Sequence, residues 1–116
     1  MNFTNKIALV TGGSRGIGFE ISKILLENGA TVLAVSRNYG HLTSAKQILP
    51  DLAIMQCDVS SYSDAERVAS KIQGVWGKLD ILVNNAGVYP DPGLGILGTP
   101  DYLLEDEGIC YYWLNK

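Results

Sequence analysis

The sequence predicts an α/β fold in which a parallel sheet of about four strands has helices on both faces. Short apolar runs, each long enough for one buried strand, occur at residues 7–10, 31–35, 53–57 and 79–83. Longer stretches with apolar residues at helical spacing separate these runs, and a glycine-rich turn follows the first of them. Strands that alternate with helices in this way are typical of a doubly wound parallel sheet.

The length of the chain limits how much of such a fold it contains. At 116 residues the chain forms one domain with room for a substantial core. A complete doubly wound domain of this type is built from two βαβαβ halves. We therefore expect an incomplete sheet that corresponds to about one half.

The composition argues against several classes of partner. Apolar residues make up 47% of the chain, charged residues 18%, and the net charge is −3. This charge gives no electrostatic basis for binding nucleic acid or an anionic membrane surface. The first strand begins without a preceding signal-peptide segment, and no apolar run reaches membrane-spanning length. We therefore expect a soluble, cytoplasmic protein.

Cysteine and histidine are too few for a disulfide framework or a convincing metal cluster. The chain has two cysteines, Cys57 and Cys110, and one histidine, His41. We interpret the two thiols as buried or idle groups in a reducing compartment.

The first strand leads directly into the glycine-rich turn and then into a helix. Residues 7–10 read IALV, and residues 11–18 read TGGSRGIG. Behind the turn, apolar side chains recur at i, i+4, i+7 and i+8, which predicts one helical face. This face comprises Ile17, Ile21, Ile24 and Leu25.

A strand, a glycine turn and a helix N-terminus together form a site suited to an anion. Gly12, Gly16 and Gly18 have no Cβ, so the backbone can adopt unusual dihedrals and approach a pyrophosphate closely. The unpaired amides of the first helical turn and the positive end of the helix dipole would face the phosphates. The alternative is an ordinary structural turn, because turns need glycine for their own geometry.

The glycine spacing resembles the cofactor motif of the classical short-chain dehydrogenase/reductases. The spacing is Gly-x-x-x-Gly-x-Gly, which differs from the Gly-x-Gly-x-x-Gly fingerprint of other dehydrogenases. The resemblance implies a Rossmann-type sheet that binds an adenine dinucleotide at this turn. The turn residues implied in binding are Gly12, Ser14, Arg15, Gly16, Ile17 and Gly18.

The end of the second strand favours NADP over NAD. Asn28 and Gly29 end the first helix, and residues 31–35 form the next buried strand, beside and parallel to the first. An NAD site usually has an acid after this strand, whereas this chain has Arg37. Arg37 and Arg15 could both reach a 2′-phosphate, as in the NADP-preferring members that the sequence resembles. The alternative is that both arginines are solvated surface residues.

The third strand ends in a second part of the cofactor site. A weaker helix over residues 38–49 precedes the strand at residues 53–57. By the family resemblance, the Asp58 carboxylate takes the exocyclic amine of adenine and Val59 covers the ring. Alternatively, Asp58 and Ser60 cap the next helix, and both roles can hold together. That helix has one apolar face and ends at Gly77. Its face comprises Ala65, Val68, Ala69, Ile72 and either Val75 or Trp76.

The fourth strand, residues 79–83, runs into the tetrapeptide Asn84, Asn85, Ala86 and Gly87. In a doubly wound sheet this strand lies beside the first, so its carboxyl end borders the ligand crevice. Ala86 and Gly87 leave room for the cofactor ribose, and the two asparagine amides can tie the strand to its neighbours. The tetrapeptide resembles the Asn-Asn-Ala-Gly signature of the family.

The remaining residues change in character. A proline- and glycine-rich loop spans residues 89–98, a helix start follows at residues 99–101, and Gly108 interrupts it. Residues 109–116 are aromatic and have no clear period. We therefore expect residues 1–106 to form the dinucleotide-binding part and residues 107–116 to form a divergent tail.

We assign no catalytic residue. The resemblance implies hydride transfer between nicotinamide and a carbonyl or alcohol carbon, with a tyrosine, a lysine and a serine as catalytic groups. Tyr112 and Lys116 stand four residues apart, but they follow the asparagines too closely to leave room for the serine-bearing fifth strand. The opening of the chain resembles the 3-oxoacyl-[acyl-carrier-protein] reductases most closely.

Two interpretations of function follow. In the first, the chain is the N-terminal part of an NADP(H)-dependent oxidoreductase that was cut near residues 105–108 and is inactive alone. In the second, it is a non-catalytic module that binds a nucleotide or a partner. The fourth strand would then have an exposed edge, through which the chain could associate with itself.

Overall fold

The computed structural model describes residues 1–85 and confirms the predicted alternation of strands and helices. Residues 86–116, which contain the predicted glycine-rich loop, helix start and tail, lie outside the described residues. The elements are β1 (Ile7–Thr11), α1 (Gly16–Glu27), β2 (Thr31–Ser36), α2 (Tyr39–Ile48), β3 (Ala53–Gln56), α3 (Tyr62–Val75) and β4 (Ile81–Asn84).

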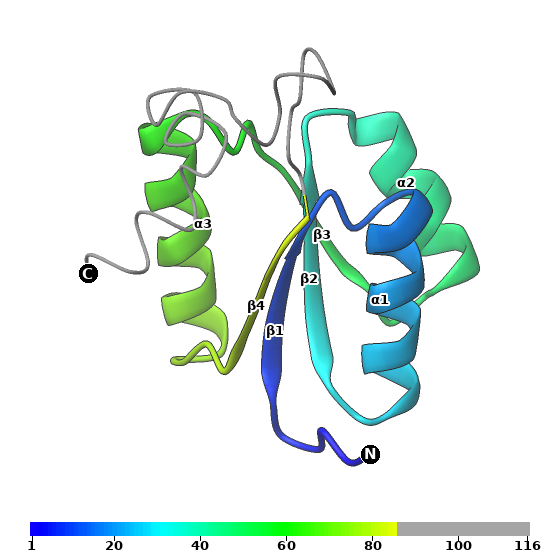
Figure 1. Cartoon of the computed structure of the whole chain (residues 1–116). Helices are drawn as coiled ribbons and strands as arrows, with labels where there is room; N and C mark the ends of the chain where they lie inside the picture. Colours follow the sequence, from blue (N-terminus) through cyan, green and yellow to red (C-terminus); the bar gives the residue numbers. More distant parts are fainter. Residues whose placement is uncertain (86–116) are drawn as a thin grey trace, which may run out of the picture.

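The strands form a parallel sheet in the order β3-β2-β1-β4. Both α1 and α2 cover one face of this sheet, and α3 covers the other (Figure 1). The chain therefore leaves β1 on one side to form β2 and β3, and returns through α3 to the other side of β1. This is the doubly wound α/β fold that the sequence predicted, with β1 at its centre.

The helix α1 forms where expected, but its buried face differs from the prediction. The residues buried against the sheet are Gly18, Ser22 and Leu25. Leu25 and Ile21 of the predicted face do contact the core, whereas Ile17 is 73% exposed and Ile24 is 45% exposed. These two residues form an isoleucine stripe that flanks the contact face. The reason is the close approach of the helix to the sheet, which selects small residues at the contact.

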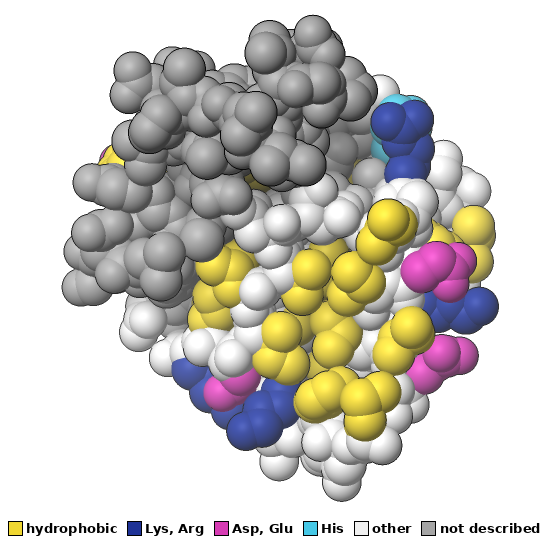
Figure 2. All heavy atoms as spheres, in the orientation of Figure 1, with side chains coloured by type: hydrophobic (Ala, Val, Ile, Leu, Met, Phe, Trp, Pro, Cys, Tyr) yellow, Lys and Arg dark blue, Asp and Glu magenta, His cyan; other side chains and the backbone are white. Residues whose placement is uncertain are grey.

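The isoleucine stripe belongs to an apolar surface beside β4. On the face of the sheet that α1 covers, Ile81 and Val83 of β4 are only half-buried. Figure 2 shows the hydrophobic side chains gathered over α1 and β4. Within residues 1–85, β4 pairs only with β1, so its other edge has no strand partner in that part of the chain.

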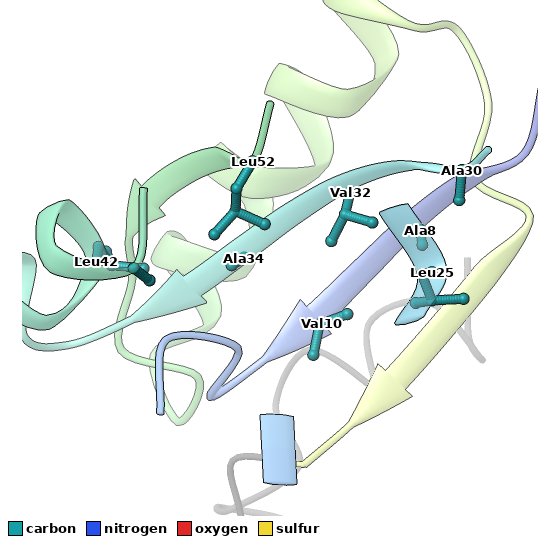
Figure 3. Close-up of a cluster of buried hydrophobic side chains, with 9 residues drawn as sticks. Ala8, Val10, Leu25, Ala30, Val32, Ala34, Leu42 and Leu52 are labelled. Atoms are coloured by element: carbon teal, nitrogen blue, oxygen red, sulfur yellow. The ribbon is translucent and has the colours of Figure 1, made fainter. Parts of the chain in front are cut away.

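Two apolar clusters hold the helices to the sheet. Alternation along the strands sends Ala8 and Val10 toward α1 and α2, and sends Leu9 toward α3. Figure 3 shows the first cluster, in which small strand side chains meet larger ones from the helices and loops. The second cluster comprises Leu9, Leu33, Val35, Cys57, Val59, Ala65, Val68 and Ile72.

The helix ends follow the sequence signals. Gly29 after α1 and Gly77 after α3 have φ values of 96° and 76°, which glycine adopts without strain. Of the two residues considered for the end of the α3 face, Trp76 packs against the second cluster, whereas Val75 is 55% exposed.

At the start of α1, Gly18 leaves no space for a side chain. A Cβ on Gly18 would lie 2.1 Å from the Gly12 carbonyl oxygen and 2.6 Å from the Asn85 amide nitrogen. Neither neighbour is a flexible side-chain end that can move away cheaply, because the first is backbone and the second belongs to a short side chain. The helix can therefore approach β1 only because residue 18 is glycine.

We expect Gly18→Ala to destabilise the chain by about 1–3 kcal/mol, the usual cost of overpacking a tight contact. Gly74→Ala is the matched control, because a Cβ at Gly74 in α3 meets nothing within 4 Å. The control should raise stability by up to about 1 kcal/mol, because alanine favours helix over glycine. Urea unfolding followed by circular dichroism measures both effects, and equal stability of the two variants would contradict the steric argument.

The amino ends of β1 and β4 are joined by a carboxylate. Asp80 Oδ2 accepts a hydrogen bond from the Ile7 main-chain nitrogen at 2.8 Å and lies 3.2 Å from Lys78 Nζ. Lys78 Nζ also donates to the Asn5 carbonyl oxygen at 2.6 Å. The bond from Ile7 and then the Lys78 ammonium lower the pKa of Asp80 from its ordinary value of 3.8.

We expect Asp80→Asn to lower the melting temperature at pH 7. A folded-state pKa below the ordinary value means that the ionised carboxylate stabilises the fold above pH 3.8, and that this contribution disappears as the pH falls through the lowered value. The difference in melting temperature between Asp80→Asn and the unmodified chain should therefore shrink toward pH 3. Asp51→Asn, at an exposed aspartate without a described side-chain partner, is the control. A difference that stays constant with pH would refute the role of the charge.

Candidate functional site

Most residues predicted from the sequence to form the site are among those that the structure describes. They lie at the end of the sheet where the strands finish. They follow the carboxyl ends of the four parallel strands, which all point the same way (Figure 1). After β1 come Gly12, Ser14, Arg15, Gly16, Ile17 and Gly18; after β2 comes Arg37; after β3 come Asp58 and Val59; and Asn84 ends β4. Ala86 and Gly87 lie outside the described residues.

The centre of this edge is the point where the winding of the chain reverses. From β1 the chain passes through α1 to β2 on one side, whereas β4 lies on the other side of β1 and is reached through α3. The chain therefore winds over opposite faces of the sheet on the two sides of β1. In open α/β sheets, ligands bind outside the carboxyl ends of the strands at such a reversal point.

The glycine turn has the backbone geometry that its sequence indicated. Gly12 and Gly16 have φ values of 65° and 56°, in the left-handed region that favours glycine. A Cβ at Gly16 would meet nothing within 4 Å, so open space lies above the backbone there. At Gly18, by contrast, the missing side chain is needed for helix packing. The three glycines therefore serve different purposes.

A fourth glycine in the turn, Gly13, is also required, although the motif predicted no role for it. A Cβ at Gly13 would lie 2.8 Å from Ala34 Cβ and 3.0 Å from Ser22 Oγ. Gly13 therefore lets the turn pass close to β2. The adjacent glycines in the sequence were a signal for this, but the contact with β2 became visible only in the structure.

The N-terminus of α1 keeps its amides available. Arg15 is the N-cap in extended conformation and makes no side-chain cap, and the first turn contains no acid. In contrast, Asn38 caps α2 and Ser61 caps α3 through their side chains. The first amides of a helix have no intrahelical acceptor. Among the residues that the structure describes, those of α1 therefore offer unpaired donors, together with the positive end of a helix dipole, to an anion.

Ser14 adds a buried hydroxyl beside these amides. Ser14 is 8% exposed, and its hydroxyl has no hydrogen-bond partner among residues 1–85. A buried polar group usually has such a partner, because leaving it unpaired costs free energy. The hydroxyl is therefore available to a bound group at the turn.

A hydrogen-bond network joins the glycine turn to the end of β4. Thr11 Oγ1 lies 3.2 Å from Asn84 Oδ1 and accepts from the Asn85 main-chain nitrogen at 2.8 Å. Asn85 Nδ2 donates to the Gly12 carbonyl oxygen at 3.4 Å. The expectation that the two asparagines tie β4 to its neighbours is confirmed. Thr11 had no assigned role, although a hydroxyl at the end of an apolar strand was a signal for one.

After β3, the Asp58 side chain accepts hydrogen bonds within its own loop, whereas Ser61 caps α3. Asp58 Oδ1 accepts from the Ser60 main-chain nitrogen at 3.0 Å and from Ser60 Oγ at 2.7 Å. The cap of α3 is Ser61, whose hydroxyl accepts from the Asp64 amide at 3.2 Å. Asp58 and Ser60 thus form a turn ahead of the helix, and Val59 beside them is buried.

The two arginines lie in the open, as a contact with an external group requires. Arg15 and Arg37 are both exposed. The backbone of Arg37 is held by Gln56, whose Nε2 donates to the Arg37 carbonyl oxygen at 3.0 Å. The loops after β2 and β3 are therefore connected at this edge.

Other kinds of site receive no support from residues 1–85. Burial, together with the nearby Asp64 charge, raises the pKa of the Cys57 thiol to about 12, so this buried group stays protonated and unreactive. This part of the chain contains no group of three or more potential metal ligands. Its helices are all too short or too polar to cross a membrane.

Comparison with known proteins agrees with this geometry. The family model described as short chain dehydrogenase matches residues 6–99. The uncharacterized oxidoreductase DltE of Bacillus subtilis (strain 168) is 43% identical over 88 residues, which are 76% of this chain and 35% of that protein. The 3-oxoacyl-[acyl-carrier-protein] reductase FabG of Vibrio harveyi is 42% identical over 95 residues, covering 78% of this chain and 38% of that protein.

A solved structure shares the fold. The structure of a proposed short-chain dehydrogenase from Novosphingobium aromaticivorans has a TM-score of 0.76 and 23% sequence identity. The match covers 97% of this chain and 47% of that one. The chain thus spans about half the length of this neighbour, and 35% and 38% of the two curated relatives. Since the family model matches most of the sequence, the chain belongs to the short chain dehydrogenases, a family of oxidoreductases that bind a dinucleotide cofactor.

Proposed function

We propose that this chain binds the adenosine and pyrophosphate end of NADP(H). The residues proposed to contact it are Gly12, Ser14, Arg15, Gly16, Ile17, Gly18, Arg37, Asp58, Val59, Asn84, Ala86 and Gly87. The single observation that supports this most strongly is the N-terminus of α1, which lacks both a side-chain cap and an acid in its first turn. It lies at the reversal point of a doubly wound sheet, where such sheets bind ligands.

The described residues fit a pyrophosphate at the glycine turn. Amides of Gly16, Ile17 and Gly18 supply donors, and the unpartnered Ser14 hydroxyl supplies another. The open space above Gly16 would admit phosphate oxygens close to the backbone. The exposed guanidinium of Arg15 contributes a full positive charge next to this turn.

The preference for NADP rests on the residues after β2. Arg37 occupies the place where an acid would accept hydrogen bonds from the ribose of NAD. An arginine there attracts a 2′-phosphate, whereas a carboxylate would repel it. With Arg15 nearby in the phosphate turn, two guanidinium groups serve the doubly charged end of the cofactor.

The adenine ring is proposed to lie against the loop after β3. Asp58 uses Oδ1 for its own turn, and within residues 1–85 its Oδ2 makes no hydrogen bond. This second oxygen can therefore accept a bond from the exocyclic amine while Val59 covers the ring. Ala86 and Gly87 are proposed to leave room for the ribose at the end of β4.

The reaction would belong to a longer form of the protein. We propose that residues 1–106 form the dinucleotide-binding part, that residues 107–116 form a divergent tail, and that the protein acts in the cytoplasm. The bound cofactor would supply hydride transfer between its nicotinamide and a carbonyl or alcohol carbon. We assign no catalytic group in this chain, which we therefore propose is a cofactor-binding portion without turnover of its own.

A second function, binding of a partner or of another copy, is favoured by the apolar surface beside β4. Ile17 and Ile24 are largely exposed, and β4 has an unpaired edge within the described part of the chain. An unpaired strand next to apolar side chains is prone to pair with another chain. We propose that the 116-residue chain associates with itself through this edge.

The cofactor assignment predicts that Arg37→Asp reverses the nucleotide preference. Loss of a charge-assisted bond and gain of repulsion should weaken NADP⁺ binding about 10- to 100-fold, while NAD⁺ binding holds or improves. Titration calorimetry with each nucleotide measures both affinities. Lys71→Asp changes the net charge equally on the exposed face of α3 and should leave the preference unchanged. An unchanged affinity ratio in the Arg37 variant would refute its role.

The self-association hypothesis predicts that Ile24→Lys shifts the chain toward the monomer. A charged side chain beside the β4 edge opposes pairing with another chain. Ile48→Lys is the matched control, because Ile48 is 68% exposed on α2, away from β4. Sedimentation velocity over a range of concentrations measures the association. A chain that is monomeric before substitution, or equal effects of both variants, would argue against the proposal.

A further inference from the structure

A polar network lies at the carboxyl ends of β2 and β3, beside the glycine turn but separate from it. These strands are neighbours, and Ser36 is paired with Gln56 in the register. The pairing continues past the strands, because the Cys57 main-chain nitrogen donates to the Ser36 carbonyl oxygen at 2.9 Å. Arg37 and Asp58 therefore leave the sheet on adjacent paths.

The network connects these two paths through side chains. Asp64 Oδ2 accepts from the Asp58 main-chain nitrogen at 2.8 Å, and Asp64 Oδ1 accepts from Arg67 Nη2 at 3.1 Å. Arg67 Nη2 also donates to the Gln56 carbonyl oxygen at 3.3 Å. Gln56 Nε2 then donates to the Arg37 carbonyl oxygen at 3.0 Å. A continuous path of contacts thus runs from the backbone of Asp58 to that of Arg37.

Ordinary helix capping does not account for Asp64. Ser61 is the N-cap of α3, and its hydroxyl accepts from the Asp64 amide. In a capping box, the side chain of the third helical residue would return to the amide of the cap. Here that residue, Asp64, reaches past the cap to Asp58, while the Ser61 amide donates to the Asp58 carbonyl oxygen at 2.9 Å. Both main-chain groups of Asp58 are therefore held by α3 and its cap.

The geometry also argues against a role in core packing. Gln56 and Arg67 are exposed, and the Arg67 side chain is 55% exposed. Neither belongs to the two apolar clusters. Their described contacts are polar and are directed at the loops after β2 and β3. The Asp58 amide, and then Arg67, lower the pKa of Asp64 from 3.8, which keeps this carboxylate ionised at neutral pH.

We propose that Gln56, Asp64 and Arg67 are positioning residues that hold the Arg37 loop and the Asp58 loop, and that Gln56 among them determines selectivity for the 2′-phosphate of the nucleotide. This inference rests on the proposed function, in which Arg37 meets the 2′-phosphate and Asp58 meets adenine. Gln56 holds the backbone of the phosphate-binding residue. Asp64 holds the backbone of the adenine-binding residue, and Arg67 joins the two.

Because the residues have different roles, each variant should change the affinities for NADP⁺ and NAD⁺ in a different way. Gln56→Met removes the donor to Arg37 while keeping side-chain length, so NADP⁺ should bind roughly 3- to 10-fold more weakly and NAD⁺ should bind equally well. Asp64→Asn affects the adenine side, which both nucleotides share. It should therefore weaken both to a similar extent and leave their ratio unchanged.

The test uses titration calorimetry of the full 116-residue chain with NADP⁺ and NAD⁺. Gln73→Met, at an exposed glutamine on α3 without a described side-chain partner, is the control and should change neither affinity. In an Arg37→Ala background, Gln56→Met should have no further effect on NADP⁺ binding, because its action passes through Arg37. A merely structural role would instead weaken both nucleotides together in the Gln56 variant.

The outcomes separate this inference from the proposed function. If the unmodified chain binds NADP⁺ more tightly than NAD⁺ and Gln56→Met leaves the ratio unchanged, the positioning role is wrong while the proposed function stands. The same holds if the Gln56 effect persists in the Arg37→Ala background. If the unmodified chain binds neither nucleotide, the proposed function and this inference fail together.

Discussion

The close approach of α1 to the end of β1 determines the geometry of the glycine turn at the carboxyl end of the central strand. Gly18 lies so near the Gly12 carbonyl that no side chain fits, and a Cβ on Gly13 would lie 2.8 Å from Ala34 Cβ of β2. These contacts bring the first amides of α1 directly over the end of the central strand. An adjustment of the helix by the width of one methyl group would displace the amides and the turn together, because protein interiors are close-packed. The geometry of the proposed anion site is therefore a consequence of how the helix packs.

Because β1 is central, its attachment to β4 matters as much as its contact with α1. The two strands are joined at both ends by polar groups: Asp80 at the amino end, and Thr11 with the two asparagines at the carboxyl end. The hydrogen bonds at the carboxyl ends of the strands also include the glycine turn, since Asn85 Nδ2 donates to the Gly12 carbonyl oxygen. The turn is thus fixed from the helix side by sterics and from the β4 side by hydrogen bonds. The N-terminus of α1 has no side-chain cap, whereas α2 and α3 each satisfy one of their first amides through a capping side chain.

Sequence reasoning succeeded where function is encoded locally and failed where it depends on contacts across the sheet. The strands, the helix bounds and the turn at Gly12 and Gly16 follow from short patterns of apolar residues and glycine. The buried face of α1 was predicted in part: Leu25 and Ile21 contact the core, but the tight contact with the sheet also selects the small residues Gly18 and Ser22. Hydrophobic periodicity does not reveal such small residues. The network of Gln56, Asp64 and Arg67 was missed, because exposed polar residues have no periodic signal. Only the register of β2 with β3 reveals that Gln56 reaches the backbone of Arg37.

Burial is greatest in the two central strands and falls in both edge strands of the described sheet. Val32 to Val35 in β2 and Ala8 to Val10 in β1 are fully buried, whereas every residue of β4 is only half-buried. On one face Leu82 of β4 packs against the second cluster, and on the other face Ile81 and Val83 pack against the first. The residues proposed to bind phosphate, 2′-phosphate and adenine follow β1, β2 and β3, and β3 is an edge strand of the described sheet just as β4 is. The β4 side is joined to the proposed phosphate turn through Asn84 and Asn85, so the packing of β4 against β1 also helps to hold that turn in place.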